Sequence, residues 1–180
     1  MSLGPLTLLM GTHILMMNVA APVLALALGR MMSIPIASGA ALAGATCFQI
    51  GLLWIWHAPG VMSGAHVPAA HAAMQVSLLA AALWFWLAVW SQIGSARWRS
   101  LFALLVTGKL FCLLGALLVF APRLLNSAHA PISSGATTIE DQQLAGLLML
   151  AACPLTYVLA GIVISARWIG ELAAADAVSK

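Results

Sequence analysis

Five long apolar runs, separated by short polar breaks, dominate the pattern of this chain. A helix that crosses a bilayer needs about 20 mostly apolar residues, and each run can supply one. The runs predict transmembrane helices over about residues 3–29, 40–56, 69–93, 100–121 and 139–168. We therefore expect an all-α fold, a polytopic membrane helix bundle that forms one domain over residues 1–180.

Individual residues within and at the ends of the runs indicate where the helices begin, bend and end. The first run lacks a basic start and is too long for a cleaved signal peptide, so we expect a retained helix. Pro22 within it predicts a kink and a freed carbonyl group. The last run begins with Glu140 and Asp141, where acidic side chains suit the positive end of the helix dipole. We expect the polar tail after Arg167 to be frayed.

The composition agrees with a membrane protein. Hydrophobic residues make up 63% of the 180 residues and charged residues 6%, with a mean hydropathy of +1.07. Soluble domains carry about 25% charged residues, so this chain has too few to cover a surface that faces water. The net charge of +3 forms no basic stripe, so we expect membrane lipids and no nucleic acid as partners. The three cysteines lie inside apolar runs and are expected to pack as small hydrophobic residues: Cys47, Cys112 and Cys153.

The basic residues indicate an orientation. Five of them follow the first, third and fifth runs, namely Arg30, Arg97, Arg99, Arg167 and Lys180. Only Arg123 follows the fourth run. The positive-inside rule then places the amino terminus outside and the carboxyl terminus in the cytoplasm. In a bacterium, this predicts a multi-pass protein of the plasma (inner) membrane whose outer side faces the periplasm.

Histidine and methionine side chains gather where the second run ends and the third begins. His57, His66 and His71 lie there, and Met74 follows His71 by three residues, on the same helical face. Imidazole and thioether groups are ligands for soft metals, which favours copper over zinc. The alternative is that the histidines simply lie at the level of the lipid headgroups.

His13 is the most informative single residue, because it lies about 15 Å below the predicted outer surface. An ionisable group at that depth is costly and indicates a function. Met10 and Met17 share its helical face. His13 is either a soft-metal ligand that accepts an ion from the outer rim, or a neutral imidazole hydrogen-bonded to Gln49 or Gln75.

The fifth run carries a stripe of polar, small and sulfur-containing residues: Gln142, Gly146, Met149 and Cys153. This spacing places them on one face, which we expect to point into the bundle. Helix packing explains Gly146 alone, whereas packing together with a ligand path would explain the whole stripe. On the second interpretation, Asp141, Gln142 and Met149 are polar or soft residues that support a metal site. Lys109 lies in the middle of the fourth run. It is neutral, snorkels to the interface, or pairs with a polar group of another segment, and we assign it no catalytic role.

Several of these motifs together resemble a known family. They are His13 with Ala21-Pro22, Trp56-His57-Ala58-Pro59, His71 with Leu83-Trp84-Phe85-Trp86, and Asp141-Gln142-Gln143-Leu144-Ala145-Gly146-Leu147-Leu148-Met149. Over about residues 6–168, the chain is similar to the CtaG-type cytochrome c oxidase assembly family. The resemblance implies a membrane protein that is not an enzyme. It also implies help in bringing copper to the catalytic subunit of a haem-copper oxidase, with that subunit or other assembly factors as partners.

The resemblance further implies a polar core of His13, His57, His71 and Asp141, which we expect to face the interior of the outer half of the bundle. The sequence departs from the family pattern where Leu9 and Val67 replace histidines that are often paired four residues apart. Two other functions remain open. One is a haem-binding electron-transfer subunit with two ligating histidines, and the other is a transporter subunit. The absence of an internal repeat counts against an alternating-access transporter.

Overall fold

The structure, a computed structural model, describes residues 4–31, 38–62, 67–92, 94–125 and 138–178. Within these ranges five helical spans are long and apolar enough to cross a membrane, and no strand occurs. The first span consists of α1 (Pro5–Leu15), the π-helix η1 (Met16–Ala20) and α2 (Ala21–Met31). The others are α3 (Gly39–His57), α5 (Pro68–Trp90), α6 (Arg97–Phe120) and α7 (Ile139–Val178), with the short α4 (Pro59–Met62) and η2 (Gly94–Ala96) in the connections. The predicted all-α fold with five membrane-crossing helices is confirmed.

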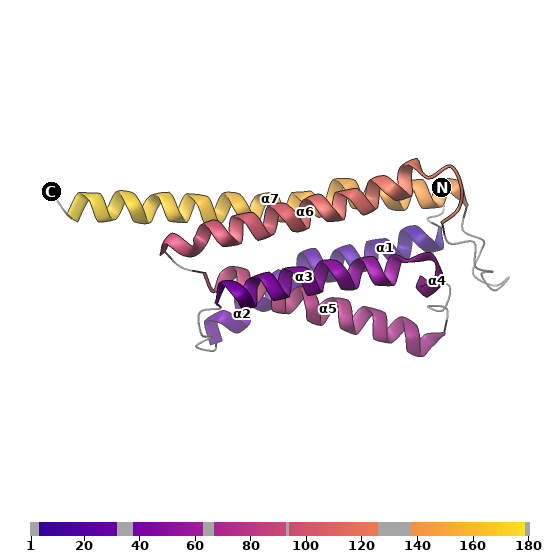
Figure 1. Cartoon of the computed structure of the whole chain (residues 1–180), viewed down its shortest axis with the longest axis horizontal. Helices are drawn as coiled ribbons and strands as arrows, with labels where there is room; N and C mark the ends of the chain where they lie inside the picture. The colour runs from indigo at the N-terminus through magenta and orange to yellow at the C-terminus, as the bar shows by residue number, and fades with distance from the viewer. Residues whose placement is uncertain (1–3, 32–37, 63–66, 93, 126–137, 179–180) are drawn as a thin grey trace.

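The helices run roughly parallel or antiparallel to one another (Figure 1). The longest contact is between α6 and α7, and α1 also packs against α7. The helix α3 packs against both α5 and α6, and α2 packs against α5. One end of the bundle holds the first residues of α1, α5 and α7 and the last residues of α3 and α6 (Figure 1). We call it the amino-terminal end.

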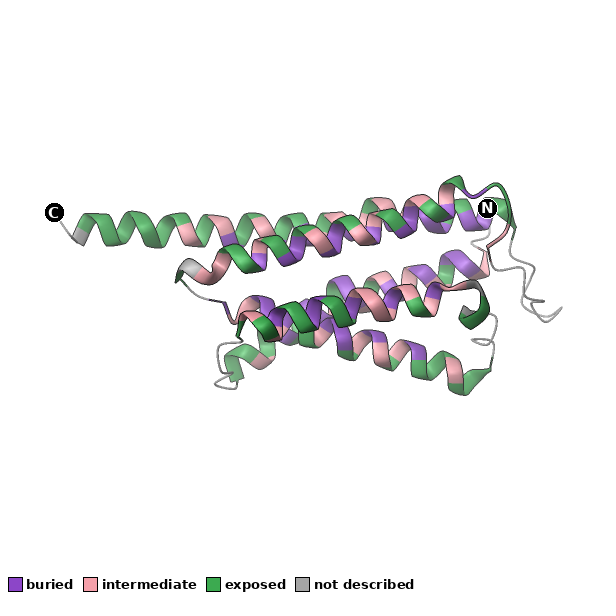
Figure 2. Ribbon diagram, in the orientation of Figure 1, coloured by how far each residue is buried: buried purple, intermediate pink, exposed green. Residues whose placement is uncertain are grey.

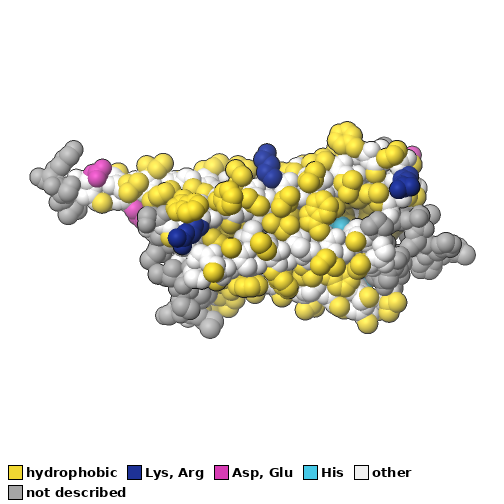
Figure 3. Space-filling view, viewed as in Figure 1, with side chains coloured by type: hydrophobic (Ala, Val, Ile, Leu, Met, Phe, Trp, Pro, Cys, Tyr) yellow, Lys and Arg dark blue, Asp and Glu magenta, His cyan; other side chains and the backbone are white. Residues whose placement is uncertain are grey.

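Burial follows the helix faces (Figure 2). The inward faces carry a hydrophobic core that includes Leu53, Phe85, Trp86 and Phe111. The outward faces are also apolar, with exposed side chains such as Phe102. Figure 3 shows hydrophobic side chains over most of one face. A helix that is hydrophobic on its outer face as well suits contact with lipid.

The α6–α7 contact is close because glycines face each other across it. A Cβ atom added to Gly146 would lie 2.8 Å from the carbonyl oxygen of Gly115, and one added to Gly115 would lie 3.1 Å from that of Gly146. Small residues allow helix backbones to approach closely in lipid. The stripe of α7 that includes Gln142, Gly146, Met149 and Cys153 is buried, as its spacing predicts.

The π-helix η1 shows what Pro22 does to the first span. In this helix the Ala21 N–H bonds to the Met16 carbonyl, five residues earlier. The next bond of that pattern would join residue 22 to the Met17 carbonyl, but proline has no N–H to donate. The indole Nε1–H of Trp86 donates to the Met17 carbonyl instead, at 3.1 Å. The predicted freed carbonyl therefore exists, and α5 satisfies it.

The same arrangement occurs at the end of α6. Leu118 lies four residues before Pro122, so its carbonyl also lacks a helical donor. Gln142 Nε2 donates to the Leu118 carbonyl at 3.2 Å and to the Arg123 carbonyl at 3.3 Å. Its Oε1 accepts from the Leu125 N–H at 2.9 Å. Gln142 therefore stabilises the turn that ends α6.

Asp141 caps the amino-terminal end of the helix α1. Its carboxylate accepts hydrogen bonds from the backbone N–H groups of Leu6 at 2.9 Å and Thr7 at 3.0 Å, and from the Thr7 hydroxyl at 2.6 Å. The first N–H groups of a helix have no internal partner, and the helix dipole favours negative charge there. Gly4 allows this approach, because a Cβ atom at that position would overlap the carboxylate. Asp141 thus lies in the first turn of α7 but caps α1.

The end of α7 differs from the prediction. We expected the helix to end near residue 168 with a frayed tail, but α7 continues to Val178. The added residues include an alanine-rich stretch, and alanine has the highest helix propensity. Arg97 also forms an ion pair with Glu171, with Nη2 and Oε1 2.7 Å apart, which ties this part of α7 to the start of α6. Polar composition alone was therefore a wrong guide to fraying.

Replacing Trp86 by Phe should lower the free energy of unfolding by about 1–3 kcal/mol, because the buried Met17 carbonyl loses its donor. Unfolding in mixed micelles with increasing dodecyl sulfate measures this change. Trp84→Phe is the matched control, since Trp84 is 45% exposed, and we expect it to change stability by less than about 0.5 kcal/mol. Equal losses in the two variants would contradict the assignment.

Replacing Asp141 by Ala should cost about 1.5–3 kcal/mol, the range for hydrogen bonds to a charged group. Hydrogen exchange resolved by residue should show faster exchange at the N–H groups of Leu6 and Thr7, with α3 unchanged. Glu140→Ala serves as the control because Glu140 is the exposed neighbour of Asp141. If both variants accelerate exchange equally, Asp141 is not the cap of α1.

Candidate metal centre

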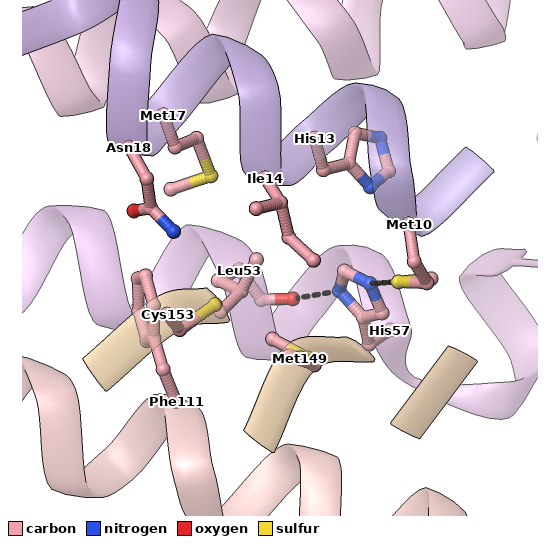
Figure 4. Close-up of a pocket in the computed structure, with 10 residues that line it drawn as sticks. All are labelled: Met10, His13, Ile14, Met17, Asn18, Leu53, His57, Phe111, Met149 and Cys153. Carbon is pink, nitrogen blue, oxygen red and sulfur yellow. Dashed lines mark hydrogen bonds between the residues drawn. The ribbon is translucent and has the colours of Figure 1, made fainter. Parts of the chain in front are cut away.

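A small cavity of about 10 Å³ lies among α1, η1, α3, α6 and α7 (Figure 4). Its lining residues belong to the half of the bundle toward the amino-terminal end. Its size is close to that of one water molecule. Ten side chains line it: Met10, His13, Ile14, Met17, Asn18, Leu53, His57, Phe111, Met149 and Cys153. Two imidazoles, three thioethers, a thiol and an amide therefore share one small space.

His57 presents an unprotonated nitrogen to this cavity. Its Nδ1 lies 2.7 Å from the carbonyl oxygen of Leu53. A carbonyl only accepts, so Nδ1 carries the proton, and in the neutral ring Nε2 keeps its lone pair. Nε2 lies 3.3 Å from the sulfur of Met10 (Figure 4). Two lone-pair donors thus face each other with no hydrogen between them, an arrangement that suits two ligands of one soft cation.

His13 is buried without a hydrogen-bond partner. Its side chain is 3% exposed, and neither ring nitrogen has a partner among the described residues. Its ring packs edge-on against that of His57, with centroids 5.8 Å apart and planes at 76°. A buried polar group without a partner is costly and calls for an explanation such as a bound water or ion. His13 and His57 therefore form a pair whose free nitrogen atoms are available to a ligand.

The sulfur atoms and the amide extend this site toward the middle of the bundle. Met17, Met149 and Cys153 are each at most 3% exposed. Asn18 points toward the Cys153 sulfur (Figure 4). Met17 and Asn18 are neighbours in the chain, and the π-helix buries both of them. The soft ligands thus form a series from Met10 and His57, near the amino-terminal end, to Cys153 deeper in the bundle.

His71 and Met74, which were predicted to belong to the metal site, do not line this cavity. His71 is exposed, and its Nε2 lies 3.4 Å from Gln75 Nε2. It lies on the face of α5 that is buried farther along, but the first turns of α5 splay away from α1 and α3 (Figure 1). Met74 is fully buried in the hydrophobic core and does not line the cavity. His66, the remaining predicted ligand, lies outside the described residues.

Asp141 and Gln142, which were predicted to support the metal site, lie outside the cavity. Their hydrogen bonds go to α1 and to the end of α6, and neither lines the cavity. Among the described residues, no group of three or more His, Cys, Asp or Glu side chains is placed to hold a metal ion. A metal in this cavity would therefore depend on thioethers in addition to the two imidazoles.

The structure also corrects the expected partners of His13. Gln49 Nε2 donates to the Tyr157 hydroxyl at 3.0 Å, and Gln75 contacts His71. Tyr157, which the sequence analysis did not single out, is stacked on Trp86 with ring centroids 5.5 Å apart. Asn18 lines the cavity but was not among the residues predicted for the metal site. The available signal was Pro22, because a proline in a helix can produce a π-turn that adds a residue to the buried face.

Comparisons with known proteins give a family for the chain. No curated protein and no solved structure matched the chain. A family model, described as cytochrome c oxidase caa3 assembly factor (Caa3_CtaG), matches residues 2–171. The match spans all five membrane-crossing helices, except for the last turns of α7. The chain therefore belongs to the cytochrome c oxidase caa3 assembly factor family.

Proposed function

We propose that this protein is a non-catalytic assembly factor that passes a copper ion toward the catalytic subunit of a haem-copper oxidase, by way of the cavity between His13 and His57. The family match supports the role in oxidase assembly. The observation that carries the copper step is the pair of facing lone-pair donors, His57 Nε2 and Met10 sulfur, 3.3 Å apart beside the unpartnered His13.

The ligand set favours transfer over tight retention. Imidazole and thioether groups select soft Cu(I), and both are neutral ligands that release the ion without taking up a proton. The series from Met10 to Met149 offers successive neutral soft ligands, whereas Cys153 would have to lose its proton before it could bind the ion. An ion held by two or three of them at a time can move along the series, because no single position surrounds it with anionic ligands.

The size of the cavity argues against haem as the occupant. Cofactor pockets have volumes of roughly 300–1,000 Å³, far above the 10 Å³ found here. His13 and His57 also contact each other directly, so a macrocycle cannot lie between their rings without moving the helices apart. A Soret band in the purified protein would speak for the haem-binding alternative.

We place the amino-terminal end of the bundle on the outer, periplasmic side of a bacterial plasma membrane. Toward the opposite end, Arg30 lies in the last turn of α2, Arg97 and Arg99 begin α6, and Arg167 lies in the second half of α7, whereas Arg123 lies at the amino-terminal end. This asymmetry fits the positive-inside rule. A reporter fused after Val178 that is active only in the cytoplasm checks the orientation. The cavity would then lie in the periplasmic half of the membrane.

Copper binding tests the site directly. The purified protein, loaded with Cu(I) under anaerobic conditions and titrated with a Cu(I) chelator, should hold about one ion per chain. Replacing His13 and His57 by Ala should weaken binding by at least about tenfold, the effect of losing roughly 1.4 kcal/mol. His71→Ala is the matched control and should bind as the native protein does, because His71 lies outside the cavity. Equal copper retention in all three proteins would refute the copper site.

Complementation tests the function in cells. Deletion of the protein should lower cytochrome c oxidase activity, and the native chain should restore it. The His13→Ala, His57→Ala double variant should restore activity only with excess copper in the medium, because added copper bypasses a weak delivery site. His71→Ala should complement without added copper. Normal oxidase activity in the deletion strain would exclude the assembly role for this chain.

A further inference from the structure

A second site lies on the outside of the bundle, along the contact between α6 and α7. Here the two helices form an open groove of about 680 Å³, lined by residues from 101–112 and 154–169. Its walls are almost entirely apolar, and small residues such as Gly108, Gly161 and Ala166 line it. Small residues allow another helix backbone to approach closely in lipid. The shape and chemistry of the groove suit a transmembrane helix.

One charged side chain stands in this groove. Lys109 is exposed and lines it, halfway along α6. At 1.5 Å per residue, it lies roughly 16–18 Å from each end of this helix. Figure 3 shows that the face around α6 and α7 is otherwise apolar, with few basic side chains. A cation at this depth, on a surface that faces lipid, is costly and indicates a partner.

The described part of the chain supplies no such partner. The ion pair seen there joins Arg97 to Glu171, and Asp141 is engaged with α1. A Cβ atom added to Gly108, the neighbour of Lys109, would lie 3.6 Å from the Cβ of Tyr157, so Tyr157 marks the level of Lys109 on α7. At 1.5 Å per residue along α7, Glu140 lies about 25 Å and Glu171 about 21 Å from Tyr157. A lipid phosphate is equally remote, because headgroups lie at the ends of the helices.

A second copy of the chain does not fit this requirement either. All four acidic residues of the sequence, Glu140, Asp141, Glu171 and Asp176, lie toward the ends of α7. None would reach mid-membrane in a neighbouring copy packed along the same axis. We infer that the groove binds a transmembrane helix of another protein that carries an Asp or Glu near the middle of its span, paired with Lys109.

Charge complementarity gives this surface its specificity. Apolar contacts between helices gain little in lipid, because acyl chains offer similar contacts. An ion pair between Lys109 and a carboxylate would instead remove two exposed charges from hydrocarbon at once, so it selects a helix with an acid at that height. The inference rests on Lys109 and the groove, and not on the copper cavity, so each proposal can fail without the other.

Site-specific photo-crosslinking in cells tests the inference. A benzoylphenylalanine residue replaces Leu105 or Ile162, which both line the groove, and Val76 on α5 serves as the control position because it is 67% exposed outside the groove. Mass spectrometry identifies the crosslinked segment. We expect the groove positions to capture one transmembrane segment with an Asp or Glu near mid-span, and the Val76 position to capture none of it.

Variants of Lys109 test the charge pair. In the crosslinking strain, Lys109→Met should lower the yield about tenfold, the effect of one strong interhelical polar contact. Lys109→Arg should retain it. Lys109→Glu should abolish the crosslink, and changing the partner's acid to Lys should restore it. Protein levels in the membrane control for folding.

Several results of these experiments would contradict the inferred partner helix. Crosslinks to lipid alone, to a second copy of this chain, or to a segment without a mid-span acid would overturn the inference. A yield unchanged by Lys109→Met would do so as well.

Discussion

Inside a membrane, every backbone N–H or carbonyl group that a helix cannot bond internally needs another partner, and this constraint organises the bundle. Pro22 leaves the Met17 carbonyl open, and Trp86 of α5 donates to it. Pro122 leaves the Leu118 carbonyl without a helical donor, and Gln142 of α7 donates a hydrogen bond to it. The first N–H groups of α1 bind Asp141 of α7. In each case the missing partner comes from a different helix, so tertiary packing completes the secondary structure.

These contacts also set the geometry of the candidate metal centre. The Asp141 carboxylate fixes the height of α1 against α7, which brings Met10 and His13 to the level at which Met149 lines the same cavity. The bond from Trp86 holds the π-helix in place, and the π-helix directs Met17 and Asn18 inward. A change in any of these contacts would shift one ligand past another by part of a helical turn. Stability and the shape of the candidate metal centre therefore depend on the same few polar contacts.

The helix α7 serves both proposed sites with different faces. Met149 and Cys153 lie on its cavity face, whereas Val158 and Ile162 line the external groove. A partner helix in the groove would therefore lie against the same helix that lines the cavity. If both proposals hold, α7 physically connects the two sites.

The sequence by itself determined the number of membrane-crossing helices, most of their boundaries and the buried stripe of α7, because hydropathy and helical periodicity are local properties. It also singled out His13, His57, Met10, Met17 and Met149, which all line the cavity. Only the tertiary structure decided that His71 is exposed, because this depends on how far α5 splays from its neighbours. It likewise decided that Asp141 caps α1 across 134 residues of chain, and that Gln49 binds Tyr157 rather than His13. Such pairings depend on the relative height of helices, which no pattern within a single helix encodes.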